Sequence, residues 1–284
     1  MAYTSFADLL AAAQGDSLAH AALAREAQES GRPVDELRDA MAVELDVMRE
    51  SVAHGLSGTA RSRSGLTGGD AAQVAARAGE DGSTLSRAIA RALAVGEANA
   101  AMGRIVAAPT GGASGVLPGV LLTLAEDRRV PDHDLVDALF TASALGAIIA
   151  ARATLSGAAG GCQAEIGSAA AMAAGAAAEM LGGTPVQSGH AASLALQGLL
   201  GLVCDPVGGL VEVPCVARNG TGVGVALAAL DMALAGVKFP IPFDEVVSAA
   251  AQVGRSLPPS LRETALGGLA ATPTGRALGT KAAP

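Results

Sequence analysis

Residues 157–181 read GAAGGCQAEIGSAAAMAAGAAAEML, and this stretch decides which kind of fold to expect. After Cys162 nearly every side chain is alanine, glycine or serine, and alanine is the strongest helix former. The whole chain repeats this character, because 50% of its residues are hydrophobic, only 2% are aromatic, and tryptophan is absent. A β-sandwich would require more valine, isoleucine, tyrosine and phenylalanine. The sequence therefore predicts a mainly α protein: a single compact all-helical domain of small-residue-rich helices with irregular Gly/Pro loops.

Size and charge exclude several classes of function. With 284 residues the chain is long enough to bury a substantial core. A formal charge of −8 and a pI near 5.0 argue against nucleic acid as a partner, since phosphates require a basic face. A small anionic substrate remains compatible with this charge, because local dipoles determine its binding.

The number of cysteines indicates the cellular compartment. Three cysteines cannot form a complete disulfide framework, and the N-terminal sequence MAYTSFADLLAAAQGD lacks the basic start of a secretory signal. We therefore expect a cytoplasmic protein with reduced thiols.

Two apolar segments, 138–155 and 166–181, raise the question of membrane insertion, since the mean hydropathy is +0.41. Their apolarity comes mostly from alanine and glycine, which contribute little to insertion. Arg152 and Glu179 lie in or near the apolar stretches, where a charge is costly in lipid. We interpret both segments as buried helices of a soluble protein with no membrane partner; the alternative is a polytopic membrane protein.

The first hundred residues are typical of surface helices that pack on one another. Pro33 suits the first turn of one helix and Gly55 its end, and Asp70 and Ser83 are expected to cap two later helices. The helix between Pro33 and Gly55 has one apolar stripe, at Val34, Leu37, Met41, Leu45, Met48 and Val52.

The cysteines are Cys162, Cys204 and Cys215, and their spacing matches no compact zinc or ferredoxin pattern. Taken alone, this spacing is compatible with three unrelated buried thiols. The surroundings favour a shared role. Cys162 opens a helix, where the dipole stabilises a thiolate, while Cys204 and Cys215 flank a Pro/Gly-rich segment that cannot be one helix. Thiolates on such rigid backbone suit an iron–sulfur cluster, and three ligands would leave one iron open.

A second candidate element is the loop APTGGASG at residues 108–115. It precedes an apolar helical segment, and backbone amides at such a junction bind carboxylate or phosphate groups. A plain turn explains the same residues equally well. The candidate substrate-binding residues in this loop are Thr110, Gly111, Gly112 and Ser114.

Pyridoxal phosphate is an alternative cofactor for such a glycine loop, and it would require a lysine for a Schiff base. The chain has only Lys238 and Lys281, and neither lies in a convincing cofactor context. The sequence therefore predicts no pyridoxal phosphate.

Four further polar residues have both a functional and a structural interpretation. His190 opens an apolar helix, where a helix cap or a satisfied core residue is the ordinary explanation. Glu165 lies three residues after Cys162 and hence on the same helical face, where it also suits the helix dipole. Arg218 and Asn219 follow Cys215 at an expected loop edge and would otherwise make ordinary loop hydrogen bonds.

Several long segments, in order, resemble the iron–sulfur-dependent L-serine dehydratase family, specifically its α subunit or catalytic domain. The segments that carry the resemblance are SGLTGGDA, GRIVAAPTGGASGVLPGVLL, GAAGGCQAEIGSAAAMAAGA, GLVCDPVGGLVEVPC with ARN, and LRETALGGLAATPTG. The resemblance runs from about residue 5 to 280. It implies one catalytic domain over 1–284, with an N-terminal helical portion (1–100) and a cluster and active-site portion (101–284).

The resemblance also implies the chemistry. It assigns a [4Fe-4S] cluster to Cys162, Cys204 and Cys215, and a lyase reaction that converts L-serine to pyruvate and ammonia, with weak activity on L-threonine. The amides of residues 109–112, called the PTGG loop below, would hold the substrate carboxylate. Many relatives have PTAGS or PTNG where this chain has PTGGAS, which leaves the interpretation of the loop intact.

Roles for individual side chains follow from the same resemblance. His190 is favoured as the general base, with Ser114 or a group from a β subunit as competitors. Glu165 is expected to support the cluster or to bind the substrate ammonium, and Arg218 and Asn219 to bind substrate. A separate β subunit and an oligomeric assembly are implied. The competing hypothesis is a non-catalytic scaffold subunit with structural thiols.

Overall fold

The computed structural model describes residues 3–79 and 81–282, and it confirms the predicted fold class. The molecule is 71% helical, and its described residues contain no β-strand. The α-helices are α1 (Phe6–Ala13), α2 (Leu18–Ser30), α3 (Val34–Leu56), α4 (Asp70–Ala78), α5 (Thr84–Ala100), α6 (Val116–Arg128), α7 (Asp132–Arg152), α8 (Gly157–Gly160), α9 (Ser168–Met180), α10 (Pro185–Gln197), α11 (Cys215–Leu234), α12 (Phe243–Ser256) and α13 (Pro273–Ala282). Short 3-10 or π segments are η1 (Gly111–Ala113), η2 (Gln163–Gly167), η3 (Val207–Gly209), η4 (Pro259–Leu261) and η5 (Gly268–Ala271).

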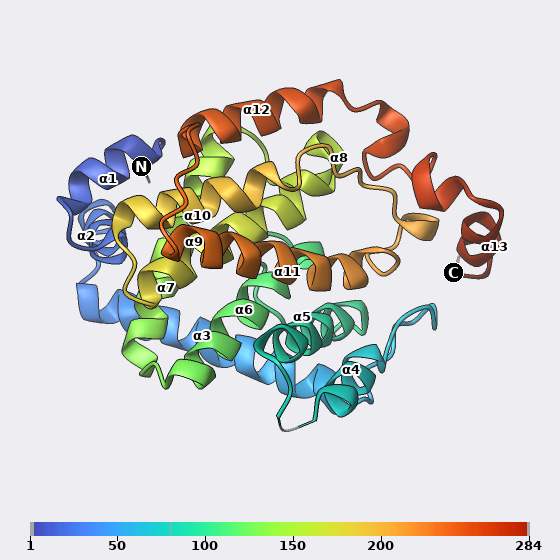
Figure 1. Ribbon diagram of the computed structural model, residues 1–284. Coiled ribbons are helices and arrows are strands. Elements are labelled where there is room, and N and C mark those ends of the chain that lie inside the picture. Colours follow the sequence, from blue (N-terminus) through green and yellow to red (C-terminus); the bar gives the residue numbers. More distant parts are fainter. Residues whose placement is uncertain (1–2, 80, 283–284) are drawn as a thin grey trace.

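Helix α9 forms the centre of the fold. Every residue from Ser168 to Ala178 is buried, and the helix packs against α6, α7, α10 and α11 (Figure 1). Small side chains allow this close approach. A Cβ built on Gly175 would lie only 2.4 Å from Leu145 Cδ1 on α7. The alanine-rich stretch is thus the core around which the other helices are arranged.

Helix α7 is the one described helix that is long and apolar enough to cross a membrane. Of its most apolar stretch of 18 residues, 67% is buried inside the protein, as in the core helix of a globular fold. At the end of α9, the Glu179 carboxylate accepts a hydrogen bond of 2.6 Å from the amide of Leu18 at the start of α2. The charge beside the apolar segments therefore has a structural partner within the chain.

Much of helix α5 is buried, although we expected surface helices over the first hundred residues. Its residues Ala92 to Ala98 are all buried, and it packs against α3 and α4 on one side and α6 and α11 on the other. The two portions of the chain therefore share one core. The reason is the run of alanine and glycine in α5, which lets α11 approach closely, as at Gly96 against Val216.

The apolar stripe of α3 is largely confirmed. Leu37, Leu45, Met48 and Val52 are buried, whereas Val34 is 40% exposed at the start of the helix. Gly55, however, does not end the helix.

Gly55 lies inside α3 where the helix crosses α5. A Cβ at this position would lie 2.1 Å from the carbonyl oxygen of Ala94. We expect Gly55→Ala to lower the free energy of unfolding by about 3 kcal/mol, because the backbone of α5 would have to move. Gly224→Ala on α11 is the matched control, since nothing lies within 4 Å of its added methyl group. Urea denaturation of both variants measures the difference, and equal stabilities would contradict the close crossing.

The two predicted helix caps have different outcomes. Ser83 caps α5, with its hydroxyl accepting from the amide of Ser86. Asp70 does not act as a cap, because it is the first residue of α4. The fully buried Glu97 instead accepts hydrogen bonds from the amides of Gly69, Asp70 and Ala71, at 2.6–3.0 Å. A carboxylate from α5 thus performs the capping that the local sequence assigned to Asp70.

Candidate active site

Cys162 lies where an irregular turn becomes the central helix. Gly161 adopts a left-handed φ of +76°, Cys162 follows it, and the π-helix η2 then continues directly into α9. The wide π turn places Glu165 beneath the thiol, with Cys162 Sγ 3.8 Å from Glu165 Oε2. The structure confirms that these two residues share one face. π turns of this kind occur frequently at functional sites.

Cys204 is held by the C-terminal part of the chain. Its amide donates to the carbonyl of Leu261 at 2.9 Å, and its carbonyl accepts from the amide of Glu263 at 2.7 Å. The segment after α12 therefore returns to fix the backbone of a buried cysteine. Cys204 Sγ lies 3.9 Å from Glu165 Oε2, the same oxygen that faces Cys162.

Cys162, Glu165 and Cys204 form a group that could hold a metal ion, because their ligand atoms all lie within 4.8 Å of one another. Gly157 lies so close to this group that any larger residue at its position would collide with it. A Cβ there would lie 2.5 Å from Glu165 Oε2 and 3.0 Å from Cys204 Sγ. Cys215 is buried nearby at the start of α11, but its sulfur is not a member of this 4.8 Å group among the described residues.

The three thiols differ in acidity. A hydrogen bond from the Cys204 thiol, together with the positive charge of Arg218, lowers the pKa of Cys162. The same interaction with Cys162, together with burial, raises the pKa of Cys204. Burial and the charge on Cys162 raise the pKa of Cys215 to about 12. Cys162 is therefore the thiol that ionises first, and the thiolate is the form that binds metals.

Glu165 is buried enough that its pKa is raised, and the negative charge of Glu263 acts in the same direction. A hydrogen bond of 2.7 Å from the Thr110 hydroxyl to Oε1 partly offsets this effect. The carboxylate thus connects the thiols on one side with the PTGG loop on the other.

Arg218 supplies positive charge to the thiols. Its Nη1 donates to Cys162 Sγ at 3.5 Å and to the carbonyl of Val203 at 2.9 Å, while Nη2 pairs with Asp205 at 2.7 Å. We expected Arg218 at a loop edge, but α11 begins at Cys215, so Arg218 lies in the first turn of that helix. A helix fixes the guanidinium direction better than a loop would.

The PTGG loop lies beside Glu165, as Gly112 shows. A Cβ on Gly112 would lie 3.4 Å from Glu165 Oε1. Thr110, Gly111 and Gly112 are half-buried, so this wall of the site remains reachable from solvent. Ser114, by contrast, is fully buried and donates its hydroxyl to the carbonyl of Gly111 at 2.8 Å.

Asn219 joins the PTGG loop to the start of α11. It is 1% exposed; its Oδ1 accepts from the amide of Gly115, and its Nδ2 donates to the carbonyls of Gly112 and Cys215. These bonds occupy the amide within the chain, so the geometry favours a positioning role. Like Arg218, Asn219 lies inside α11 and not at a loop edge.

A family model described as the serine dehydratase alpha chain matches residues 13–270. The chain belongs to the serine dehydratase alpha-chain family. Among its relatives, the probable L-serine dehydratase alpha chain of Bacillus subtilis is 49% identical over 263 residues, which cover 91% of this chain and 87% of that protein. The L-serine dehydratase alpha chain of Peptoniphilus asaccharolyticus is 43% identical over 258 residues, which cover 89% of this chain and 88% of that protein.

The serine dehydratase family also contains longer chains. The L-serine dehydratase of Streptomyces coelicolor is 38% identical over 275 residues, which cover 93% of this chain but only 59% of that protein. The resemblance that we noted from sequence motifs is thus confirmed over most of the chain.

His190 lies half-buried on α10. No hydrogen bond or ion pair among the described residues joins its imidazole to the cysteines, to Glu165 or to the PTGG loop. Of the three candidate catalytic residues, Glu165 is the one that the described residues show within hydrogen-bonding reach of the thiols.

Two residues near the site were not singled out from the sequence. Asp205, which is 2% exposed, bridges Arg218 and the amide of Leu269, and Gly268 has a left-handed φ of +57° beside its carboxylate. Its position next to Cys204 was an available signal. Asn99 on α5 has its side chain against Gly111, at 3.4 Å from a built Cβ. Nothing in the local sequence of α5 distinguishes Asn99.

Asn219 and Asn99 allow a matched comparison of their roles. We expect Asn219→Ala to lower the free energy of unfolding by about 2 kcal/mol or more, since it leaves buried backbone groups without partners. Asn99→Ala should change stability by less than about 0.5 kcal/mol, because its side chain makes no hydrogen bond within the described residues. Thermal and urea unfolding measure both. Equal losses would contradict the bridging role of Asn219.

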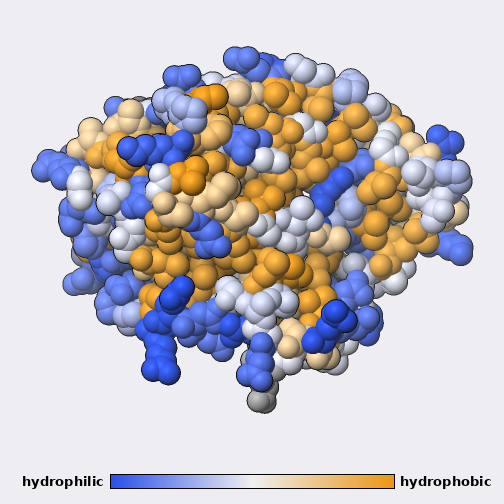
Figure 2. Space-filling model, viewed as in Figure 1, coloured by the Kyte–Doolittle hydropathy of each residue, from blue (hydrophilic) through white to orange (hydrophobic). Residues whose placement is uncertain are grey.

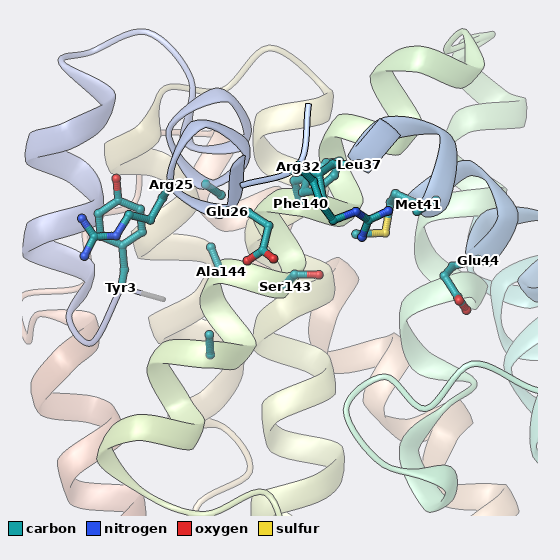
Figure 3. Close-up of a pocket in the computed structure, with 13 residues that line it drawn as sticks. Tyr3, Arg25, Glu26, Arg32, Leu37, Met41, Glu44, Phe140, Ser143 and Ala144 are labelled. Carbon is teal, nitrogen blue, oxygen red and sulfur yellow. The ribbon is translucent and has the colours of Figure 1, made fainter. Parts of the chain in front are cut away.

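A cavity of about 390 Å³ lies elsewhere, between α2, α3 and α7 (Figure 3). Its floor includes Phe140 and Ala144, and the guanidinium of Arg25 lies over the ring of Tyr3 at 5.6 Å. It contains no cysteine or histidine, so it offers none of the reactive groups found near Cys162.

Proposed function

We propose that this chain is the catalytic α chain of an L-serine dehydratase. The reaction removes the Cα proton and the β-hydroxyl of L-serine as water. The resulting 2-aminoacrylate tautomerises to an imine, which water hydrolyses to pyruvate and ammonia. The observation that carries the proposal is the Glu165 carboxylate, which contacts two buried thiols and the PTGG loop at once. Relatives that match most of this chain are named as L-serine dehydratase alpha chains, which agrees with this activity.

The thiols suit the [4Fe-4S] cluster that the family resemblance implies. Cys162, Cys204 and Cys215 are the residues that would hold it; all three are free and buried. The lowered pKa of Cys162, the cation beside it and the glycine at 157 fit a group with soft sulfur ligands. When bound, such a cluster supplies a Lewis acid that assists departure of the substrate hydroxyl.

Residues of the PTGG loop would bind the substrate carboxylate. The half-buried amides of Gly111 and Gly112 lie at the start of η1, where a helix leaves amides without internal partners. The Asn99 side chain against Gly111 adds a donor from α5. Glu165 would pair with the substrate ammonium, on the side of the loop that faces the thiols. Together these contacts would fix the direction of the Cα–H bond.

The group that accepts the Cα proton comes, in our proposal, from a separate β chain. Ser114 already donates its hydroxyl within the chain, and the imidazole of His190 makes no hydrogen bond to the thiols among the described residues. Three apolar residues on segments around the site are exposed, namely Val211 (37%), Leu266 (72%) and Leu269 (47%). Figure 2 shows hydrophobic surface on this face that extends onto the lobe formed by the C-terminal segment. A partner chain would cover such a surface.

His190→Ala separates the two sources of the base. We expect the variant to keep pyruvate formation within about threefold of wild type, because the imidazole of His190 makes no hydrogen bond or ion pair with a site residue among the described residues. A loss of a hundredfold or more, with iron content unchanged, would restore His190 as the base.

Pyridoxal phosphate is not part of the proposed mechanism. Lys238 is exposed beyond the C-terminus of α11, a helix of 20 residues and hence about 30 Å long, which begins at Cys215. Lys281 lies in the last turn of α13. A reduction of the purified chain with borohydride in the absence of L-serine should therefore leave its mass unchanged.

L-Threonine is proposed as a weak alternative substrate. It differs from L-serine by one methyl group, which a pocket discriminates by only about 1–3 kcal/mol.

Anaerobic reconstitution tests the proposed function. The chain is loaded with iron and sulfide, combined with the β chain, and assayed for pyruvate from L-serine. We expect turnover with both chains, little turnover with either alone, and loss of activity in air. Reconstituted α and β chains that contain iron but form no pyruvate would overturn the proposal, and the scaffold hypothesis would then be favoured.

A further inference from the structure

A second cavity lies next to η2 and does not include Glu165 in its lining. It has a volume of about 210 Å³, and its walls come from the end of α7, from α8, η2 and α9, and from α10 and α12. Gln163, Ala164 and Ser168 line it, whereas Cys162 and Glu165 do not. The cavity is therefore adjacent to the candidate active site but separate from it.

The cavity has a rigid frame. The side-chain amide of Gln163 donates to the carbonyl of Ala250 at 2.8 Å and accepts from the amide of Gly201 at 2.9 Å. Helices α12 and α8 touch at Gly254 and Gly160. A Cβ added to Gly254 would lie 2.9 Å from the Cα of Gly160. A space held open by such contacts is a preformed pocket and not a packing fault that side-chain motion closes.

One polar group inside the cavity lacks a partner. Ser168 lines the cavity and is 0% exposed, and its Oγ makes no hydrogen bond with any described residue. A buried hydroxyl without a partner costs free energy, so most such groups in proteins are paired. The serine is therefore available to a ligand that offers a polar atom at the inner end of the pocket.

The charge around the cavity is positive. Arg152 and Arg255 belong to the lining, which contains no aspartate or glutamate. Arg255 is exposed and makes no ion pair among the described residues. Arg152 has only a distant partner, at 3.7 Å, in Asp244, whose carboxylate already accepts from the amides of Phe6 and Ala7. Two guanidinium groups therefore remain available to an anionic group.

From these observations we infer that the cavity binds a small carboxylate with a second polar group at its other end. The carboxylate pairs with Arg255 and Arg152, and the distal polar atom bonds to Ser168. The volume is below the roughly 300 Å³ of pockets for drug-sized ligands, so a nucleotide does not fit. An occupant contacts Gln163, the residue that follows Cys162, which places the site where it can influence the cysteine.

Binding of 4-hydroxybutyrate to the full reconstituted chain, measured by titration calorimetry at low salt, tests the inference. Butyrate lacks the distal hydroxyl, and 4-hydroxybutyramide lacks the charge. We expect saturable binding of one molecule of 4-hydroxybutyrate per chain, roughly three- to tenfold tighter than either comparator. No saturable binding, or equal affinity for all three probes, would overturn the inference.

Single substitutions test whether the probe binds in this cavity. Ser168→Ala should abolish the preference for 4-hydroxybutyrate over butyrate. Arg255→Gln should reduce the preference for the acid over the amide, because only Arg152 then remains to pair with the carboxylate. Arg128→Gln, an exposed arginine on α6, is the matched control and should bind like wild type. Glu165→Gln should also bind normally. Loss of binding in Glu165→Gln, with normal binding in Ser168→Ala, would place the probe in the active site and contradict the inference. Because the readout is binding, its outcome does not depend on the proposed dehydratase activity.

Discussion

Cys162→Ser is expected to abolish iron binding and to reduce pyruvate formation from L-serine roughly a thousandfold or more. The reason is that the Lewis acid lowers the activation barrier by several kcal/mol, and each 1.36 kcal/mol corresponds to about a factor of ten in rate. Cys162 is the thiol with the lowered pKa, held by Arg218 at 3.5 Å, so a hydroxyl that stays protonated cannot replace it. Iron analysis and the anaerobic pyruvate assay measure both effects.

The control for this variant is Ala176→Ser, which adds a buried hydroxyl in α9 without touching the thiols. It should retain its iron and most of its activity. Cys204→Ser and Cys215→Ser are expected to behave like Cys162→Ser. If all three serine variants kept wild-type turnover, the thiols would be structural, as the scaffold hypothesis states.

Glu165→Gln is expected to reduce kcat/KM roughly a hundredfold while iron content stays close to that of wild type. The amide keeps the size of the side chain but loses the charge that we assign to the substrate ammonium, and charged hydrogen bonds contribute about 1.5–3 kcal/mol. The contact with the Thr110 hydroxyl can persist in the variant, since the amide oxygen still accepts a hydrogen bond. The defect should therefore appear in substrate binding and turnover, and not in folding.

Glu263→Gln provides the matched control. Glu263 is close enough for its charge to raise the pKa of Glu165, but its side chain makes no hydrogen bond among the described residues. We expect its kcat/KM to stay within about threefold of wild type. Equal losses in the two variants would mean that general negative charge matters, and the specific role of Glu165 would be wrong.

The fold was predictable from the sequence because its signals are local. Alanine and glycine content indicated close-packed helices, and periodicity predicted α3 within one or two residues at its ends. The cap of α4 was not predictable, because it comes from Glu97, which lies 27 residues after Asp70. Contacts between elements that are distant in sequence leave no local pattern.

The same distinction applies to the site. The pairing of Cys162 with Glu165 follows from helical spacing, and the structure confirms it. The approach of Cys204 to both residues depends on the C-terminal segment, which fixes the cysteine through Leu261 and Glu263. The start of α11 at Cys215 was missed because the prolines and glycines before it indicated a longer irregular segment.

The central claim is that three thiols jointly hold a cluster that the reaction requires. Iron and acid-labile sulfide per chain, determined on anaerobically reconstituted protein together with its rate of pyruvate formation, test it most directly. We expect about four of each per chain, and an activity that falls in parallel with the cluster absorbance when air is admitted. A colourless, iron-free preparation that deaminates L-serine at the full rate would contradict the account.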